Sequence, residues 1–314
     1  MRKMIVSGIL CVLISGGVFA MGTSGKAEVN TPSAETLKGA RIEQYYDYDN
    51  KKYIFSFFDE NDKLVKRMAQ TAVDATVINV VDNYSLGVAT DRIMRVNKIA
   101  SKAAAKHPGK IIALAGIDPR RPEAPALLRR CLTEFKMSGL KWHPDNGYYP
   151  NSQEAYAMLN VLNEFGYPLL THCSPLPHSR AKFAHPIHLD DIAVDFPNIE
   201  IIAAHMGHLW WYEWAALAQY KKNINGDLAM WQLVAMARPA IFRRYLREIL
   251  DNIGPDQVVW STDAPVFEPM VSTGQFIEIM RGLTKKDSSG IVFTQEEVDA
   301  MLGGNAARIF KLKK

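Results

Sequence analysis

Histidine and aspartate side chains stand at the ends of four short apolar segments of this sequence. These four residues are His143, His172, His205 and Asp263. A single histidine after an apolar strand is usually a packing residue, but packing does not readily explain four such ends. Imidazole nitrogen and carboxylate oxygen bind divalent metals such as zinc or manganese, and an imidazole exchanges protons near neutral pH. The four residues therefore predict a site for metal binding and proton transfer.

The elements that would carry these residues alternate along the chain. Seven apolar runs have the length of buried strands, at 76–81, 110–117, 140–143, 167–172, 199–205, 224–230 and 258–263. Seven amphipathic runs have the spacing of helices, at 62–72, 89–106, 122–137, 152–165, 188–196, 209–221 and 241–252. Such alternation is typical of βα units and a parallel sheet. One more strand candidate near the N-terminus would make eight.

The predicted architecture is a (β/α)8 TIM barrel of the α/β class, with an irregular or degenerate first strand. The C-terminal strand ends of a barrel meet at one mouth, where the chemistry of this fold takes place, so the four residues would converge. A doubly wound open sheet is the alternative, but no Gly-x-Gly-x-x-Gly sequence follows the first strand. We expect the barrel domain to span 41–314, after a leader at 1–20 and a linker at 21–40.

The leader has the pattern of a secretory signal peptide. Arg2 and Lys3 precede an apolar run that ends at Phe19, and cleavage is expected near Ala20. The run is short for a membrane span, which takes about 20 residues. We therefore expect an exported protein, periplasmic or secreted, with no membrane attachment after cleavage. An uncleaved anchor is the alternative.

The charge balance excludes a nucleic-acid-binding class. The chain has 37 Lys and Arg against 33 Asp and Glu, whereas nucleic-acid binders gather basic residues on one face. A small-molecule substrate is the expected partner. Cys131 and Cys173 would remain after leader cleavage, and we expect both to be buried free thiols.

The chain from about Lys63 to Leu312 resembles the amidohydrolase-related family. This is a (β/α)-barrel group that includes aminocarboxymuconate-semialdehyde decarboxylase, resorcylate-type decarboxylases and several lactone hydrolases. The similar segments are Gly-Ile-Asp-Pro-Arg-Arg at 116–121, Gly-Leu-Lys-Trp-His-Pro at 139–144, Thr-His at 171–172, Asp-Phe-Pro at 195–197, Ala-His-Met-Gly at 204–207, Ser-Thr-Asp-Ala-Pro at 261–265 and Leu-Gly-Gly-Asn-Ala-Ala-Arg at 302–308. Each segment is weak alone, but their shared order along the chain is specific.

The resemblance implies a role for each matching residue. His172 and Asp263 would bind a divalent metal, zinc in the first place and manganese as the alternative. Asp263 would also handle the proton of a metal-bound water, whose pKa the metal would lower from about 16 to about 7. His205 would polarise a substrate oxygen or act as general acid or base. His143 and Lys141 would line the mouth and meet a substrate carboxylate.

One motif of the family is missing. Its first strand normally ends in His-x-His, which supplies two metal ligands, but this sequence has no histidine before His107. Some decarboxylases of the family carry Glu in place of the first His, and Glu43, in the segment 40–45, is the corresponding candidate. A competing first strand at 53–58 and other acidic residues give the alternatives Asp59, Glu60, Asp47 and Asp49. A chain without any first-strand ligand would bind a catalytic metal poorly, because catalytic zinc usually has three protein ligands.

Aromatic and histidine residues nearby are secondary candidates. Trp210 and Trp214 would share one face of a helix. Core packing or a subunit contact is the simplest interpretation, with Trp210 as the candidate for a substrate-facing wall. The histidines of the loop after the fifth strand are expected to be solvated rather than to form a second metal site: His178, His185 and His188.

The sequence predicts a metal-dependent hydrolase that acts on a small carboxylate-bearing ester, lactone or amide, with water activated by a metal at His172 and Asp263. A metal-dependent decarboxylase of a hydroxyaromatic or muconate-like acid would use the same residues and is the alternative. The missing His-x-His allows a third interpretation, an inactive barrel that binds a small molecule or a partner. The resemblance is compatible with a homodimer.

Overall fold

A parallel sheet of eight strands forms the centre of the molecule. The computed structural model describes residues 7–12, 40–47, 52–59, 63–177, 179–264 and 266–312, the first three stretches by their backbone alone. The strands are β1 (Ser7–Val12), β4 (Ala75–Val80), β5 (Ile111–Gly116), β6 (Leu140–Trp142), β7 (Leu169–His172), β8 (Ile201–Ala204), β9 (Ile224–Asp227) and β10 (Val258–Val259), and they are neighbours in this order. Every pair in this sheet is parallel.

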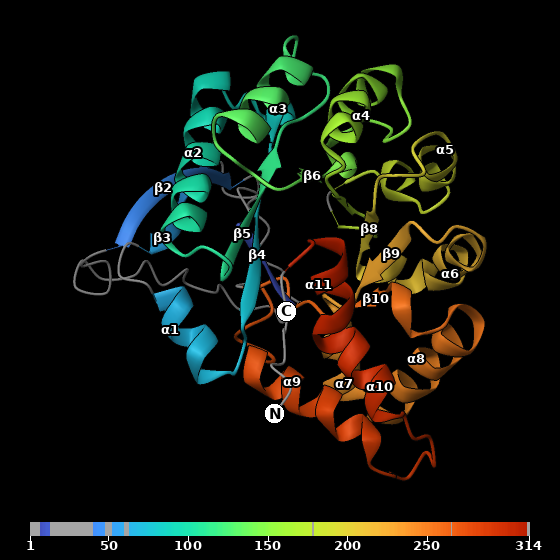
Figure 1. Ribbon diagram of the computed structural model, residues 1–314. Helices are drawn as coiled ribbons and strands as arrows, with labels where there is room; N and C mark the ends of the chain where they lie inside the picture. Colours follow the sequence, from blue (N-terminus) through green and yellow to red (C-terminus); the bar gives the residue numbers. More distant parts are fainter. Residues whose placement is uncertain are drawn as a thin grey trace.

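Helices follow the strands, and most of them lie on the outside of the sheet, whereas α11 lies near its centre, as Figure 1 shows. They are α1 (Lys63–Gln70), α2 (Thr90–Lys106), α3 (Ala124–Thr133), α4 (Gln153–Phe165), α5 (His188–Asp195), α6 (Trp211–Tyr220), α7 (Trp231–Ala237), α8 (Pro239–Ile253), α9 (Thr273–Arg281), α10 (Gln295–Asp299) and α11 (Asn305–Ile309). Among the described helices, none has the length and apolar composition needed to cross a bilayer. The fold is the predicted (β/α)8 barrel.

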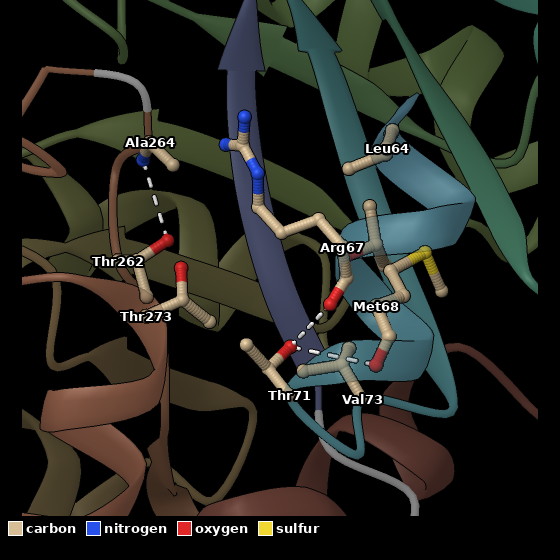
Figure 2. Close-up of a pocket in the computed structure, with 9 residues that line it drawn as sticks. Leu64, Arg67, Met68, Thr71, Val73, Thr262, Ala264 and Thr273 are labelled. Atoms are coloured by element: carbon tan, nitrogen blue, oxygen red, sulfur yellow. Dashed lines mark hydrogen bonds between the residues drawn. The ribbon is translucent and has the colours of Figure 1, made fainter. Parts of the chain in front are cut away.

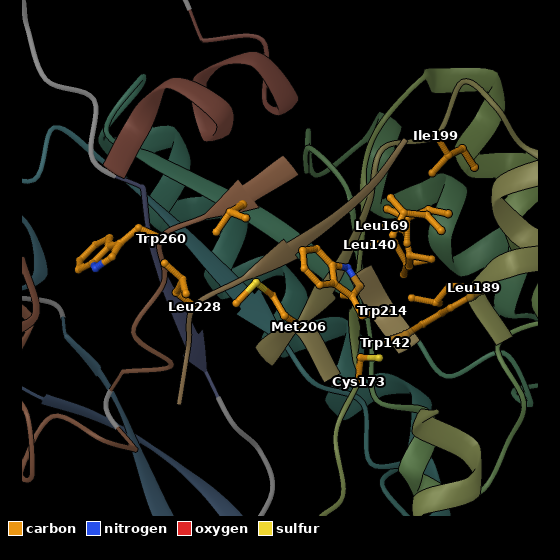
Figure 3. Close-up of a cluster of buried hydrophobic side chains, with 14 of the residues drawn as sticks. Leu140, Trp142, Leu169, Cys173, Leu189, Ile199, Met206, Trp214, Leu228 and Trp260 are labelled. Carbon is orange, nitrogen blue, oxygen red and sulfur yellow. The ribbon is translucent and has the colours of Figure 1, made fainter. Parts of the chain in front are cut away.

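Alternation along the strands divides the apolar core into two layers. One set of strand residues packs against the helices, as Leu140, Trp142 and Leu169 do; Figure 3 shows part of this outer layer. The residues between them face the barrel interior, where Leu170 and Val259 pack together with side chains from β4, β5, β8 and α11. Successive side chains of a strand point to opposite faces. A polar residue that lies two positions after an inward-facing apolar residue, at the C-terminal end of a strand, therefore points into the mouth of the barrel.

Helix ends follow the expected local chemistry, as α4 illustrates. The Ser152 hydroxyl accepts a hydrogen bond from the backbone N–H of Ala155 at 3.3 Å, which caps the first turn. Gly166 ends the helix with φ of +61°, a left-handed conformation that glycine adopts without steric cost. The predicted helix at 152–165 is thus confirmed nearly to the residue.

The first strand of the sheet differs from both sequence-based candidates. Segments 40–45 and 53–58 do form strands, but β2 (Ala40–Asp47) and β3 (Lys52–Asp59) pair antiparallel with each other in a separate two-stranded sheet. The place beside β4 is taken by β1. The two strands are close together in the sequence and pair along their whole length, so each satisfies the backbone hydrogen-bonding groups of the other. Neither was therefore required to join the barrel.

Other differences concern element ends. The predicted strands at 199–205 and 258–263 end sooner, at Ala204 and Val259, because the chain turns out of the ladder there. The predicted strand at 224–230 ends at Asp227, and the short helix α7, which the sequence did not predict, begins at Trp231. Strand β1 lies within the predicted leader, and the linker at 21–40 lies outside the described residues except for Ala40.

Candidate active site

Three imidazole rings lie in a row at the C-terminal ends of neighbouring strands. The rings of His143 and His172 are stacked, with centroids 4.4 Å apart and planes 13° apart. The ring of His205 meets His172 edge-on, at 5.0 Å between centroids. All three residues are more than nine-tenths buried. The structure therefore brings together three of the four strand-end residues that the sequence singled out.

Strand register explains two of the three positions. Leu140 and Trp142 pack against the helices, so Lys141 and His143 face the interior. Leu170 faces the interior, and His172, two residues later, does so as well. Ile202 and Ala204 face the interior of the barrel, so the same alternation predicts that His205 points toward the helices. A left-handed backbone, with φ of +65°, instead turns the chain at this residue and brings its ring to His172.

Hydrogen bonds fix the protonation pattern of His172. Its Nε2 donates to the carbonyl of Ser174 at 2.9 Å, so Nδ1 carries the lone pair. Burial, reinforced by the neighbouring imidazole of His143, holds the pKa of His172 well below its usual value. The ring is therefore neutral at neutral pH, which is the form that binds metals.

Lys141 and Asp145 add charge beside the histidine row. Asp145 is buried and forms an ion-pair contact with Nδ1 of His143. Burial by itself would raise the pKa of Asp145, but His143, His172 and Lys141 together hold it below its usual value. Lys141 is only 3% exposed, and within the described part of the chain its amine has no hydrogen-bond or ion-pair partner. A buried cation in this situation is suited to an anionic group of a ligand.

Asp227 is a site residue that the sequence analysis missed. It ends β9 at 2% exposure, and one carboxylate oxygen accepts hydrogen bonds from the backbone N–H groups of His205 and Ala229. Burial raises the pKa of Asp227, against the opposing effect of the His205 imidazole. Its signal in the sequence is a lone aspartate after Ile-Asn-Gly, but the apolar pattern predicts a strand that continues to Met230 and so hides this strand end.

Asp82 and Arg121 form a second polar group that the sequence analysis did not single out. Asp82 follows β4, and both of its oxygens accept from the Arg121 guanidinium, at 2.6 and 2.7 Å. Both side chains are almost fully buried. Arg121 also donates to the carbonyl of Val88 and to the hydroxyl of Thr90. Since this guanidinium is fully engaged, the pair holds the loops after β4 and β5 together.

Asp263 and Glu43 are the other predicted metal ligands. Asp263 follows β10, is half-buried and has a left-handed backbone with φ of +50°. Glu43 stands on the separate hairpin, opposite Ser56 in the register of β2 and β3, and its side chain lies outside the described residues, as do those of Asp47 and Asp59. Glu60 and Asp49 lie outside them entirely.

The described residues supply some of the donors that a divalent metal needs. His172 and Asp263 offer suitable donor types, and Ser174 orients His172 as an outer hydrogen-bond partner typically does. However, nowhere in the described ranges do three His, Cys, Asp or Glu side chains gather closely enough to hold a metal ion. The described residues thus provide the right donor chemistry without a complete donor set.

Trp210 lies beside the loop that follows β7. Its ring is 4.7 Å from that of His185, and it precedes α6 rather than sharing a helix face with Trp214. Trp214 is fully buried and donates from Nε1 to the carbonyl of Asn225 at 3.2 Å, which confirms the packing interpretation for this residue. His188 donates to the carbonyl of Lys182, and His178 lies outside the described residues.

A small pocket lies apart from the histidine row (Figure 2). Arg67 and Met68 of α1 line it on one side, and Thr262 and Ala264, next to Asp263, line it on the other. The hydroxyls of Thr71 and Thr262 bond to backbone groups within this region. None of the three row histidines lines this pocket.

A barrel whose polar side chains gather at the C-terminal strand ends has the architecture of a TIM-barrel enzyme. The chain belongs to the amidohydrolase family, whose model matches residues 40–312. The resemblance inferred from the sequence motifs is thereby confirmed. A search of curated proteins found no match.

Solved structures with this fold include several decarboxylases. A 5-carboxyvanillate decarboxylase from Sphingomonas paucimobilis is 17% identical, over 81% of this chain and 84% of its own, with a TM-score of 0.60. A 2,6-dihydroxybenzoate decarboxylase from Rhizobium is 15% identical, over 98% and 99% of the two chains, with a TM-score of 0.63. A dihydroxybenzoic acid decarboxylase from Polaromonas sp. JS666, solved with manganese and the inhibitor 2-nitroresorcinol, is 15% identical over 100% and 98%, with a TM-score of 0.63.

Proposed function

We propose that the protein is a decarboxylase of small hydroxylated aromatic acids. The observation that carries this proposal is the buried amine of Lys141, which no described residue contacts by a hydrogen bond or ion pair, beside the row of three imidazoles. This arrangement offers a binding group for a carboxylate and a proton donor in one desolvated site. The structurally similar decarboxylases favour this reaction over the hydrolysis that the sequence motifs first indicated.

Each group has a defined task in this reaction. Lys141, with His143 held by Asp145, would bind and orient the substrate carboxylate. The bond between the ring carbon and the carboxyl carbon breaks, its electron pair stays on the ring carbon, and carbon dioxide leaves. The imidazolium of His205 delivers the proton that forms the new carbon–hydrogen bond. General acid catalysis of this kind typically contributes about 10²- to 10⁴-fold to a rate.

A divalent metal is the proposed cofactor, because the Polaromonas relative was solved with manganese and His172 and Asp263 are suitable donors. Such an ion would withdraw charge from a substrate oxygen. Since the described side chains do not complete a donor set, we assign no step to the metal. Metal content after loading with zinc or manganese, compared with His172→Ala and Asp263→Ala, tests this part separately.

Carbon dioxide release is the decisive assay. Purified protein, with and without added manganese or zinc, is incubated with dihydroxybenzoates and a carboxyvanillate, and release is measured together with His205→Asn. We expect release by the parent protein and a loss of about 10²-fold or more in the variant. Hydrolysis of a carboxylate-bearing lactone without any carbon dioxide release would instead support the hydrolase. Inactivity on both substrate classes would support an inactive binding barrel.

Export from the cell also remains a proposal, which rests on the leader pattern at residues 1–20. The pairing of Ser7–Val12 with β4 instead favours a protein in which this segment is not removed and forms a strand of the sheet. These two observations make opposite predictions for the N-terminus of the purified protein.

A further inference from the structure

We propose that Asp227 is a positioning residue that holds His205 in the orientation needed for proton transfer. The inference rests on the proposed function, in which His205 donates the proton. Asp227 itself would not exchange a proton with the substrate. Its task would be to hold the turn that carries His205 and so to select the ring nitrogen that faces the substrate.

The end of β9 and the residues that follow it up to the start of α7 hold His205 at three atoms. Oδ1 of Asp227 accepts from the backbone N–H of His205 at 2.9 Å and from that of Ala229 at 3.0 Å. The carbonyl of Ala229 contacts Nδ1 of His205 at 3.2 Å. The indole of Trp231 donates to the carbonyl of His205 at 2.8 Å. Asp227 is central here, because the same carboxylate oxygen bonds the backbone of His205 and that of Ala229, whose carbonyl contacts the His205 ring.

These bonds select one tautomer of His205. A carbonyl oxygen only accepts hydrogen bonds, so Nδ1 of His205 must carry a hydrogen to bond Ala229. In the proposed reaction, Nε2 is then the nitrogen that delivers the proton. Because the same ring meets His172 edge-on, this tautomer defines which side of the histidine row can serve as acid or base.

The turn needs this support because its backbone is strained. His205, Met206 and His208 have φ of +65°, +48° and +51°, a left-handed region that costs non-glycine residues of order 1–3 kcal/mol each. The side chain of Met206 is buried and lies beside Trp214 (Figure 3), which holds the second residue of the turn in place. Asp227 holds the first residue of the turn through its bond to the backbone N–H of His205. Without its oxygen, the backbone of His205 would be free to relax toward ordinary strand geometry.

Two variants separate positioning from direct proton transfer. Asp227→Asn keeps an acceptor oxygen in place but lacks a carboxyl proton, whereas Asp227→Ala removes both. We expect kcat for carbon dioxide release to fall less than about threefold in the Asn variant. In the Ala variant it should fall by about 10²-fold, the usual size of a lost general-acid contribution. The KM should stay within about threefold of the parent value in both, because Asp227 does not bind the substrate.

The ¹⁵N spectrum of the histidine side chains gives a readout that does not depend on activity. At a pH at which its ring is neutral, we expect His205, assigned through His205→Asn, to be the Nδ1–H tautomer in the parent protein and in Asp227→Asn. In Asp227→Ala it should become a mixture of tautomers. If this shift occurs while no variant or parent releases carbon dioxide, the proposed function fails and the positioning role stands.

Two results would overturn the proposal. An Asn variant as inactive as the Ala variant, with the parent tautomer intact, would show that Asp227 transfers the proton itself. Parent-like kcat and tautomer in a folded Ala variant would show that His205 needs no such support. If Asp227→Ala does not fold, the Asn variant alone decides: parent-like kcat and tautomer support positioning, and inactivity refutes it.

Discussion

At the scale of single residues, burial decides what each charge in the site does. Asp82 and Arg121 are a closed pair, in which every strong donor is matched. Lys141 is equally buried, but no described side chain forms a hydrogen bond or ion pair with its amine, and Asp145 and Asp227 interact with it only through their charge. Buried charges are costly unless they are paired, so an unpaired one is retained for a ligand more readily than for stability. This contrast separates a structural ion pair from a binding group.

Replacement of Lys141 by Met should weaken substrate binding without weakening the fold. Loss of a hydrogen bond to a charged group, worth about 1.5–3 kcal/mol, should raise the KM for a hydroxybenzoate about 10- to 100-fold. The melting temperature should stay constant or rise, because a buried charge is removed. Lys102→Met, at an exposed position on α2, is the control. An unchanged KM in Lys141→Met would exclude a carboxylate-binding role.

Replacement of Asp82 by Asn should destabilise the protein strongly. The buried Arg121 guanidinium would lose its counter-charge, which typically costs about 3–5 kcal/mol. Urea unfolding measures the change. The exposed pair Arg129 and Glu164 provides the control, since Glu164→Gln should cost less than about 1 kcal/mol. Equal effects at the two sites would contradict the structural role assigned to the buried pair.

At the scale of elements, the ends of β8 and β9 are packed as one unit. Gly226 of β9 leaves room for Met206 and Trp214, because a Cβ atom there would lie 2.5 Å from Cγ of Met206 and 2.6 Å from Cζ2 of Trp214. The neighbouring residue Asp227 bonds the same turn from the other face of the strand. Strand alternation thus lets β9 support His205 from two sides.

Gly226→Ala should therefore destabilise the protein and impair the site together. Overpacking of this kind costs about 1–3 kcal/mol, and a displaced Met206 would move the His205 turn, so kcat should fall as well. Gly282→Ala, where nothing lies within 4 Å of the added Cβ, is the matched control and should change neither. A stable, fully active Gly226→Ala variant would show that the slot tolerates an extra methyl group.

At the scale of the whole molecule, the N-terminal strand poses a distinct question. β1 supplies the neighbour of β4 in the sheet, yet it lies within a segment with the pattern of a cleavable leader. The amidohydrolase match begins only at residue 40. Whether the mature barrel contains β1 therefore decides how its first edge is completed.

Thiol counting, together with the intact mass, answers this question. Cys131 and Cys173 are buried free thiols, and burial raises the pKa of Cys131 to about 12. Neither should react with a thiol reagent at pH 8 in the folded protein. After unfolding, three thiols should react if β1, which contains Cys11, is retained. Two should react if the chain starts near Met21, as the leader pattern predicts.

The sequence by itself determined the barrel and most of its helices, because apolar periodicity and βα alternation reflect local burial that each segment must satisfy. It also placed His143 and His172 at the mouth, since the C-terminal ends of barrel strands meet there. Only the tertiary structure decided the orientation of His205, which depends on a strained turn held by Asp227 and Met206. The pairing of Asp82 with Arg121, the hairpin of β2 and β3 and the place of β1 were likewise decided in three dimensions. Each depends on contacts between segments far apart in the chain or on a choice among pairing partners, and local pattern carries no information about either.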